Sequence, residues 1–200
     1  METIRGRMSH DISSVELSER IAHYNQIQLD LGTGDGRFVR WMADRQKDTF
    51  FIGVDACREN LRATSRIKLP NAMFVIASAQ ALPFELNGLA SQININFPWG
   101  SLLASLLNND VSLIQGLLSI TRPYAKLKIH LNGEALTTAG WMLEAGADQM
   151  ETNLNTSGWV TRSGSCLTGH ELRSIPTTWA KRLVFGRDPR AIRLSFQRRA

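Results

Sequence analysis

The chain has 200 residues, of which 43% are hydrophobic, and a formal net charge of +5 at pH 7. This length and hydrophobic content suit a single α/β domain spanning residues 1–200. A basic balance favours polyanionic partners such as RNA, DNA or an anionic membrane surface without choosing among them. The N-terminus lacks the apolar core of a signal peptide, and no stretch approaches the roughly 18 apolar residues of a membrane span. We therefore expect a cytoplasmic protein that does not bind a membrane.

Cysteine and histidine residues predict neither cross-links nor metal binding. Cys57 and Cys166 occur in unrelated contexts, which agrees with a reducing cytoplasm. The four histidines are scattered, and none has the spacing of metal ligands. Positive charge is concentrated at the end of the chain, where the residues after position 180 include seven Lys and Arg but only one acid, Asp188. Both a solubilising terminus and a polyanion-binding surface fit this pattern.

The predicted elements begin with a small hairpin or arm around Gly6, within residues 1–13, and a helix over 14–24. Strands and helices then alternate. Short apolar runs predict strands over 27–32, 49–55, 72–78, 92–98 and 125–131. Helical patterns cover 34–46, 58–68 and 101–120, the last broken near Asn108–Asn109. The first of these helices carries Phe38, Trp41 and Met42 on one face.

Past residue 132 the pattern weakens. It predicts partial helix over 136–158, a strand and loop over 159–172, a short helix over 177–186 and a closing strand over 191–198. Because strands alternate with helices, the sequence predicts a Rossmann-like α/β fold. Its mostly parallel seven-stranded sheet would carry helices on both faces, and the N-terminal hairpin would be an extension.

The first strand ends in the glycine-rich segment LDLGTGDGR. Gly32, Gly34 and Gly36 would let the backbone approach a ligand where a Cβ would collide. The carboxylates of Asp30 and Asp35 repel a pyrophosphate but suit a cation. S-adenosylmethionine carries an ammonium and a sulfonium and has no phosphate, so these acids favour it over a nicotinamide or flavin. A simple tight turn between strand and helix is the other interpretation.

The next two strands support a methyl-donor site. Asp55 ends the second strand, where an acid can accept both ribose hydroxyls of an adenosine. It could also cap the helix that begins near Arg58. After the third strand, in SAQALPF, the backbone and Gln80 could read the edge of an adenine.

The fourth strand ends in NFPWG, where the methyl group of a donor should project. Many amino-methylating enzymes carry Asp/Asn-Pro-Pro-aromatic at this place. Here Phe97 replaces the polar residue and the second proline is missing, which argues against exocyclic amine chemistry. Trp99 instead suits a target held by stacking, and Trp179 lies in a polar setting, TTWAKR. Core packing is the other interpretation of both tryptophans.

Several segments resemble one family. They are TIRGRMSHDI, LDLGTGDGR, FFIGVDACRENL, FVIASAQALPFEL, FPWGSLL and TWAKRLVFGR, in order across most of the chain. Together they are similar to the aminoglycoside-resistance 16S ribosomal RNA methyltransferases, of the Kam/Npm type, that modify N1 of adenine-1408. The resemblance implies a class I methyltransferase fold, S-adenosylmethionine as cofactor, and 16S rRNA in the 30S subunit as the partner of a monomer.

The resemblance also implies roles for individual residues. The donor would be bound by Asp30, Gly32, Thr33, Gly34, Asp55, Ala79 and Gln80. A flipped adenine would lie between Trp99 and Trp179, with Ser101 and Thr177 as polar neighbours. RNA phosphates would be contacted by Arg58, Arg62, Arg66, Lys68, Lys181, Arg182, Arg187 and Arg190.

Four departures and two alternatives stand beside this interpretation. One is that the family has a basic residue near Pro189, for which Arg187 or Arg190 would substitute here. The family often has Glu at the position of Gln80 and a lysine-rich segment where this chain has arginines, and residues 132–176 match poorly. A tRNA guanine-N7-type methyltransferase shares a similar opening, although its usual Asp-Pro-Trp continuation is missing here. A non-catalytic RNA-binding protein with a degenerate donor site is the second alternative.

Overall fold

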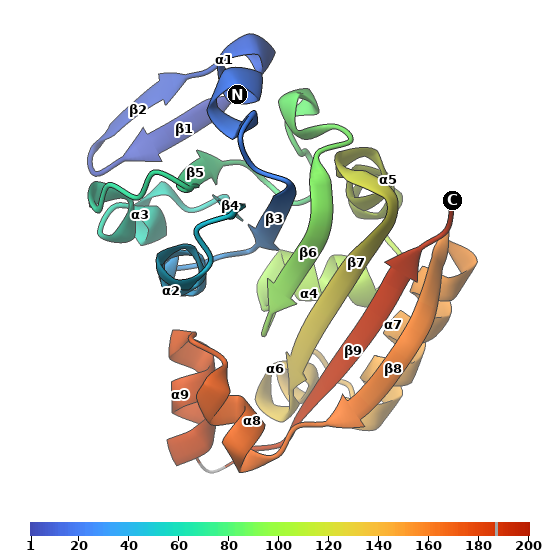
Figure 1. Ribbon diagram of the computed structural model, residues 1–200. Helices are drawn as coiled ribbons and strands as arrows, with labels where there is room; N and C mark the ends of the chain where they lie inside the picture. Colours follow the sequence, from blue (N-terminus) through green and yellow to red (C-terminus); the bar gives the residue numbers. More distant parts are fainter. Residues whose placement is uncertain (187) are drawn as a thin grey trace.

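The computed structural model describes residues 1–186 and 188–200. Its centre is a sheet with the strand order β2-β1-β5-β4-β3-β6-β7-β9-β8 (Figure 1). The strands are β1 (Glu2–Arg5), β2 (Met8–Asp11), β3 (Gln26–Leu31), β4 (Thr49–Asp55), β5 (Ala72–Ile76), β6 (Ala90–Asn96), β7 (Thr121–Asn132), β8 (Trp159–Cys166) and β9 (Ala191–Arg198).

Helices connect most of these strands. They are α1 (Ser14–Ile21), α2 (Arg37–Arg45), α3 (Arg58–Leu61), α4 (Gly100–Leu107), α5 (Val111–Ile120), α6 (Gly133–Thr138), α7 (Leu143–Thr156), α8 (Gly169–Ser174) and α9 (Thr178–Phe185). Two 3₁₀ turns, Thr64–Arg66 and Phe84–Leu86, complete the elements. Within the described ranges, no helix is long and apolar enough to cross a membrane.

The predicted fold class is confirmed, with one correction to the sheet. Strands β5, β4, β3, β6 and β7 run parallel. Strand β9 is antiparallel to β7, and β8 is antiparallel to β9, so β8 runs in the direction of the parallel strands. The sheet has nine strands and not seven, because the N-terminal hairpin is part of it. Strand β1 pairs antiparallel with β5 through Thr3 and Val75. Pairing at this edge satisfies backbone groups that an isolated arm would leave to water.

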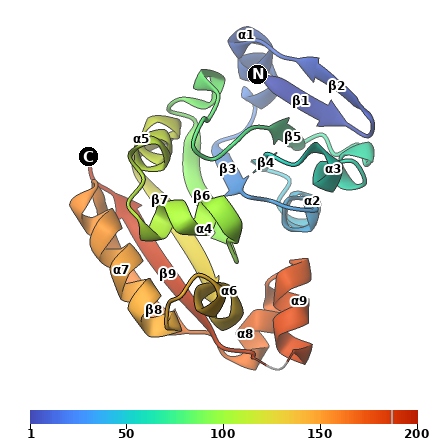
Figure 2. The same ribbon diagram turned by 180° about the vertical axis from the view of Figure 1, so that it is seen from behind.

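Helices cover both faces of the sheet, as predicted. Alternate residues of β4 point to opposite faces, so Phe50 and Ile52 belong to the same core cluster as residues of α1, α4, α5 and α7, whereas Phe51 belongs to a second cluster with residues of α2 and α3. Figure 2 shows α4 and α7 in front of the sheet. Each face therefore has its own apolar core, and the strand ends remain free to carry polar side chains.

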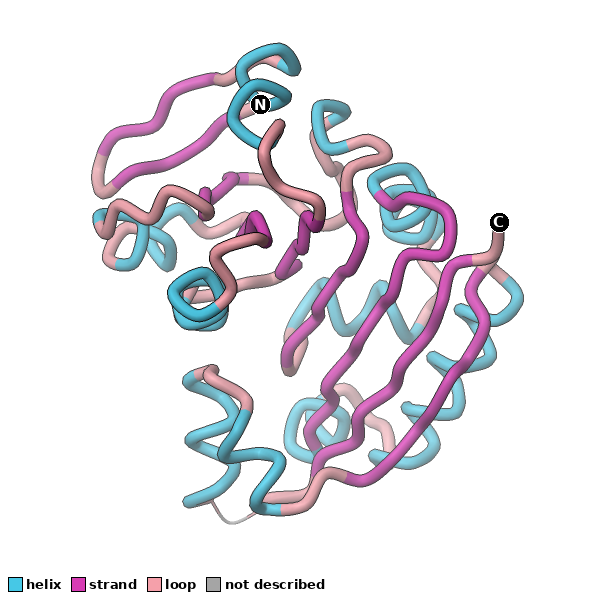
Figure 3. Tube along the Cα trace, viewed as in Figure 1, coloured by secondary structure: helices cyan, strands magenta, loops and turns pink. Residues whose placement is uncertain are grey.

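A third, smaller cluster lies at the carboxyl ends of the parallel strands. It joins Phe97 to Leu172 of α8 and to Ala180 and Leu183 of α9. Figure 3 shows α9 as a separate helix across from these strand ends, beside α2. The weakly patterned C-terminal region therefore forms the wall of a site at the carboxyl edge of the sheet.

Two predicted helices are interrupted. The break near Asn108–Asn109 is confirmed, since Asn109 adopts a φ of 53° and the side chain of Asp110 caps α5. The helix predicted over 58–68 is wrong in its second half. It ends at Leu61, and Thr64–Arg66 form a 3₁₀ turn, where the Thr64 hydroxyl donates to the carbonyl of Asp35.

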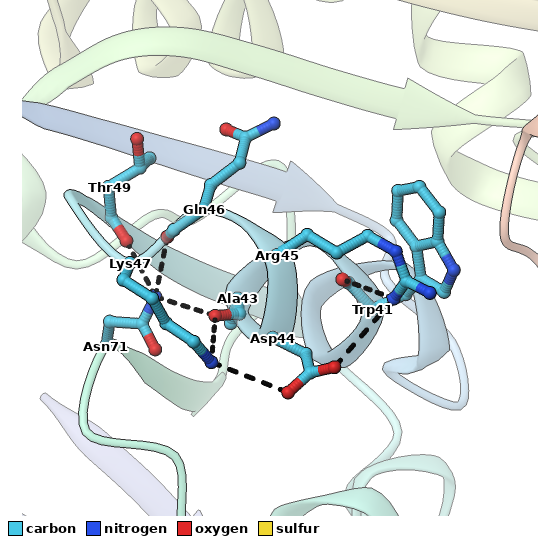
Figure 4. Close-up of polar contacts among 8 residues, drawn as sticks. All are labelled: Trp41, Ala43, Asp44, Arg45, Gln46, Lys47, Thr49 and Asn71. Atoms are coloured by element: carbon cyan, nitrogen blue, oxygen red, sulfur yellow. Dashed lines mark hydrogen bonds and ion pairs between the residues drawn. The ribbon is translucent and has the colours of Figure 1, made fainter.

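Asn71 fastens α2 to the start of β4 and is almost completely buried. Its Nδ2 donates to the carbonyl oxygens of Ala43, Gln46 and Thr49 at 3.0, 2.9 and 3.0 Å (Figure 4). Two of these carbonyls belong to the end of a helix, where no amide of the helix can reach them. One side chain thus supplies hydrogen bonds to three backbone carbonyls between α2 and β4, and no sequence pattern predicts this contact.

Asn71→Ala should destabilise the protein by about 1–3 kcal/mol, because buried carbonyls lose their donor. Thermal or urea unfolding measures this loss. Asn87→Ala is the matched control, since Asn87 is exposed. Equal stability of the two variants would contradict the role given to Asn71.

Candidate active site

The carboxyl ends of β3, β4, β5 and β6 surround a cavity of about 520 Å³, which α9 closes from the opposite side (Figure 1). All the residues predicted to bind the donor line it, as do both tryptophans, Ser101, Thr177 and Arg182. Residues from four strand ends and a distant C-terminal helix therefore meet in one place, as expected for a parallel α/β sheet.

The glycine-rich turn is held against the end of β4. The amides of Gly32 and Thr33 both donate to the carbonyl of Val54, at 2.9 and 3.0 Å. Gly36 has a φ of 70°, and a Cβ there would approach the Phe74 ring to 2.6 Å. Gly34, with a φ of 56°, has no atom within 4 Å of the place of a Cβ. The turn thus has tight packing on one side and open space toward the cavity.

Asp30 is the buried acid of the site, with only 3% of its surface exposed. Its carboxylate accepts hydrogen bonds from the Thr33 hydroxyl at 2.5 Å and from Asn96 Nδ2 at 2.8 Å. Burial raises the pKa of Asp30 to about 7; the two hydrogen bonds oppose this rise, and the charges of Asp55 and Asp35 add to it. Among the described residues, no cation bonds to this carboxylate. It is therefore suited to a cationic ligand group.

Asp55 organises the backbone at the end of β4. Its Oδ2 accepts from the Gly34 amide at 2.7 Å, and its Oδ1 accepts from the Cys57 amide at 2.8 Å. Sequence analysis proposed either ribose binding or capping of the following helix. Cys57 is the N-cap of α3 and no side-chain hydrogen bond caps this helix, so the capping prediction is wrong. Asp55 bonds the Cys57 amide ahead of the helix, and its carboxylate lines the cavity.

Asn96 is a site residue that sequence analysis missed. Besides donating to Asp30, its Oδ1 lies 2.7 Å from Nδ1 of His130 on β7. Since the amide oxygen can only accept, Nδ1 carries the proton. Burial lowers the pKa of His130 to about 4, with Arg193 and Lys128 adding to the effect, so the ring is neutral at pH 7. Asn96 could have been found from the sequence, because it is a polar residue at the end of the fourth predicted strand, directly before Phe97.

The FPW segment is held in an unusual backbone conformation. Phe97 is buried and adopts a φ of 54°, which is rare for a bulky residue. Its amide donates to the His130 carbonyl at 2.8 Å, and its ring stacks on the His130 ring with 5.8 Å between centroids. This arrangement fixes the start of the loop that presents Trp99.

Trp99 and Trp179 stack on each other, with ring centroids 5.0 Å apart and 25° between their planes. Both are half-buried, and neither belongs to the fully buried core. Trp99 Nε1 is buried with no partner among the described residues. The guanidinium of Arg182 lies 5.0 Å from the Trp179 ring centroid. The two aromatic side chains predicted to hold a base are thus together.

Helix α9 is attached to the glycine-rich turn through its first residues. Thr177 caps the helix, since its hydroxyl accepts from the Ala180 amide at 2.9 Å. The next residue, Thr178, donates to Asp35 Oδ2 at 2.7 Å, a contact that sequence analysis missed. This hydrogen bond joins positions 143 residues apart in the chain and places Trp179 over the cavity.

Three predicted site residues, Gln80, Ala79 and Ser101, offer few free side-chain polar atoms to a ligand. Gln80 is held within the protein, because its Nε2 donates to Ser105 Oγ at 2.9 Å and its Oε1 accepts from Ser78 at 2.5 Å. Ala79 presents no polar side chain. Ser101 is exposed near the start of α4. Reading of an adenine edge would therefore fall largely to the backbone here.

The residues predicted to contact RNA are not equally available. Arg58 pairs with Glu2 and donates to Ser9 at 2.7 Å, which ties it to the hairpin. Arg190 makes two 2.8 Å hydrogen bonds to Asp188. Arg62 pairs with Glu59 at 3.1 Å. Exposed positions remain at Arg66, Lys68, Lys181 and Arg182, whereas Arg187 lies outside the described residues.

The cavity chemistry fits S-adenosylmethionine. Three carboxylates line it, those of Asp30, Asp35 and Asp55, and among the described lining residues Arg182 is the one cation. Such a set repels a pyrophosphate and attracts an ammonium or sulfonium. The buried carboxyl of Asp30, which no cation among the described residues pairs with, supports this fit most directly.

Comparisons with known proteins agree with this geometry. The family model of NpmA, 16S rRNA (adenine(1408)-N(1))-methyltransferase, matches residues 2–198. A relative of that name from Escherichia coli is 32% identical, covering 98% of this chain and 97% of its own. The crystal structure of the aminoglycoside resistance methyltransferase NpmB1 is 32% identical with a TM-score of 0.82, covering 98% of each chain.

A third similar structure is a 16S rRNA (adenine(1408)-N(1))-methyltransferase variant from Catenulisporales acidiphilia, crystallised with the cosubstrate SAM. It has a TM-score of 0.88, covers 100% of this chain and 97% of its own, and at 21% identity supports the fold alone. The match of the family model and the Escherichia coli relative goes further. On these two findings, the chain belongs to the family of 16S rRNA (adenine(1408)-N(1))-methyltransferases.

Proposed function

We propose that the protein transfers a methyl group from S-adenosylmethionine to N1 of adenine-1408 in 16S rRNA. One observation carries the proposal: a stacked tryptophan pair lines the same cavity as the donor-binding carboxylates. Stacking on an aromatic face is how proteins hold an extruded base, whereas the acids suit a cationic donor. The tRNA guanine-N7 methyltransferases usually carry an acidic residue after the Phe-Pro pair, and this chain has Trp99 there, which argues against that alternative.

The donor would lie along the strand ends. We assign its ammonium group to Asp30 and its ribose hydroxyls to Asp55. Gly32, Thr33 and Gly34 would lie against it, and Ala79 and Gln80 would flank its adenine. When bound, S-adenosylmethionine supplies an electrophilic methyl group on a sulfonium centre. The intact acids and glycines argue against a degenerate donor site.

The chain's own contribution would be position and charge. Adenine N1 has a free lone pair at neutral pH, so the reaction needs no general base. Trp99 and Trp179 would hold the base in line with the methyl group and exclude water. The methylated ring is cationic, and the π faces of the two tryptophans would stabilise the charge as it develops. Ser101 and Thr177 would be polar neighbours of the base.

Base binding requires the tryptophan pair to separate. The centroids are 5.0 Å apart, whereas a ring between them needs about 7–8 Å, two aromatic contact distances. Trp179 is carried by a helix outside the two main cores, so α9 is the element we expect to move. The pair would then be a closed form of the base site.

The wider setting is also proposed. Residues 1–200 would act as one domain, supported by the continuous sheet. The substrate would be 16S rRNA within the 30S subunit, bound by a monomer in the cytoplasm, and methylation would confer aminoglycoside resistance. Exposed Arg66, Lys68, Lys181 and Arg182 would contact phosphates, and Arg62 could do so by exchanging its ion pair with Glu59.

Labelled donor tests this function directly. Purified protein should methylate 30S subunits, and mapping by primer extension should place the modification at adenine-1408. Bulk tRNA is the parallel substrate. Methylation of tRNA alone, or of another rRNA nucleotide, would reject the proposal.

The raised pKa of Asp30 predicts a pH-dependent stability. A carboxyl with a higher pKa in the folded state binds its proton on folding, so stability falls as pH rises from about 4 to about 7. At about 1.4 kcal/mol per pKa unit the loss is on the order of 2–4 kcal/mol. Urea unfolding without donor, at pH 5 and pH 8, should show it in the wild type.

Asp30→Asn should remove this dependence, because the amide does not titrate in this range. Asp44→Asn changes an exposed carboxylate and should leave it unchanged. The raised pKa would be refuted if the difference in unfolding free energy between wild type and Asp30→Asn were the same at pH 5 and pH 8.

Asp55→Ala should weaken S-adenosylmethionine binding by about 1–3 kcal/mol, since ribose hydroxyls lose a charged acceptor. Calorimetry measures the affinity. Because Asp55 also accepts from two backbone amides, a thermal melt must accompany each titration, and Asp148→Ala on α7 is the exposed control. Unchanged affinity in a folded Asp55→Ala protein would remove the assignment.

Trp99→Ala and Trp179→Ala should each cost roughly 1–3 kcal/mol of base stacking, expressed in turnover on 30S subunits. Phenylalanine at either position should cost less, since a face remains. Core packing alone would instead predict about 3–5 kcal/mol of lost stability. Melts and methyl transfer on the same four variants distinguish these results, and normal folding with wild-type turnover in both alanine variants would refute the sandwich.

A further inference from the structure

Helix α2 presents its tryptophan to solvent. The sequence pattern placed Phe38, Trp41 and Met42 on one face, and their spacing of three and four residues within α2 agrees with this, although their burial differs. Phe38, Val39 and Ala43 are buried, whereas 38% of Trp41 is exposed. Trp41 thus lies at the border between the buried face of α2 and solvent, and part of its ring is accessible to a ligand.

Trp41 lines a groove of about 720 Å³ between α2, the segment after the 3₁₀ turn Thr64–Arg66, and the α8–α9 region. We call this the α2–α9 groove. Five cations and one acid line it: Arg37, Arg40, Arg45, Arg173, Lys181 and Asp44. The apolar side chains of Ile67, Leu69 and Ile175 also line the groove.

The charge of the groove is only partly compensated. Arg37 pairs with Asp35 at 3.1 Å and Arg45 reaches Asp44 at 3.9 Å. In the part of the chain that the structure describes, Arg40, Arg173 and Lys181 have no carboxylate within ion-pair distance. Three unpaired cations converging on one groove repel one another, and a polyanion in the groove would relieve that repulsion.

Trp41 is ordered by its own helix. The Arg45 guanidinium lies 4.0 Å from the Trp41 ring centroid and donates to the Trp41 carbonyl at 3.4 Å (Figure 4). This stacking leaves the ring partly exposed and places a cation beside it. An aromatic face next to guanidinium groups is the arrangement by which proteins bind an unpaired base and its phosphates.

The α2–α9 groove lies next to the candidate active site. Asp35 accepts from Thr178 of α9 at 2.7 Å and pairs with Arg37 of α2, so one carboxylate lies between the two places. Lys181, in the groove, follows Trp179 by two residues on the same helix. A strand leaving the cavity over this carboxylate would therefore enter the groove.

We propose that the α2–α9 groove is a second RNA contact, which binds the strand flanking the methylated adenine. Arg40, Arg173 and Lys181 hold its phosphates, and an unpaired base stacks against Trp41. The inference rests on the proposed RNA substrate but concerns docking, not methyl transfer. It commits to RNA as the occupant, because the groove offers positive charge and an aromatic face together.

Binding of 30S subunits and of protein-free 16S rRNA, at several salt concentrations, tests the proposal with full-length protein. Arg40→Glu and Arg173→Glu should each weaken both interactions and lower the salt slope by about 1–2. Trp41→Ala should weaken both about 5- to 100-fold, with less change in the salt slope. Donor affinity should stay at the wild-type value in all three variants, and a thermal melt should show that each is folded, since most of Trp41 is buried and its removal lowers stability.

Matched controls change the same residue types elsewhere. Lys126→Glu reverses an exposed charge at the amino edge of the sheet, and Phe84→Ala removes an aromatic side chain that is 71% exposed. Both should bind RNA as the wild type does. Losses in the controls as large as in the groove variants would mean a general charge effect and would overturn the proposal.

Two further outcomes are decisive. Wild-type RNA binding by the groove variants would overturn the proposal, even if their methyl transfer fell. Loss on 30S subunits without loss on protein-free rRNA would make a ribosomal protein the occupant and would overturn it too. If the wild-type protein bound RNA but methylated nothing, the proposed function would fail, while the binding series would still decide the role of the groove.

Discussion

The buried carboxylate of Asp30 is the contact on which the site depends. It accepts from Thr33 in the glycine-rich turn and from Asn96 at the end of β6, and Asn96 is in turn oriented by His130 on β7. Three neighbouring strands are thereby held in register at their carboxyl ends. The energetic cost is a charge kept out of water, which a cationic ligand would offset.

Much of the architecture could be predicted because it follows from local chemistry. Short apolar runs separated by helical patterns indicated parallel strands, and Asp30 and Asp55 stood out because each ends such a run. The break before α5 was visible in Asn108–Asn109. The strands β4 and β9 occur where the pattern placed them. Parallel topology then brings strand ends together without any further information.

Other features depend on contacts between distant residues. The side chain of Asn71 satisfies a helix end, Thr178 reaches Asp35, and Thr3 pairs with Val75, yet none of these positions is unusual within its own segment. Helical spacing places Phe38, Trp41 and Met42 on one face of α2, but it does not reveal that Phe38 is buried while 38% of Trp41 is exposed. Such features follow from tertiary packing, which single-sequence periodicity does not contain.

The hydrogen bond between Thr178 and Asp35 has a thermodynamic consequence. Asp35 also pairs with Arg37, so a displacement of α9 that parts the two tryptophans must disturb the contacts that set the width of the groove beside α2. Occupancy at the two places would then be linked by a coupling free energy, and linkage makes that coupling reciprocal. An RNA strand that widens the groove would lower the cost of admitting a base by the same amount that an admitted base tightens the strand's own binding.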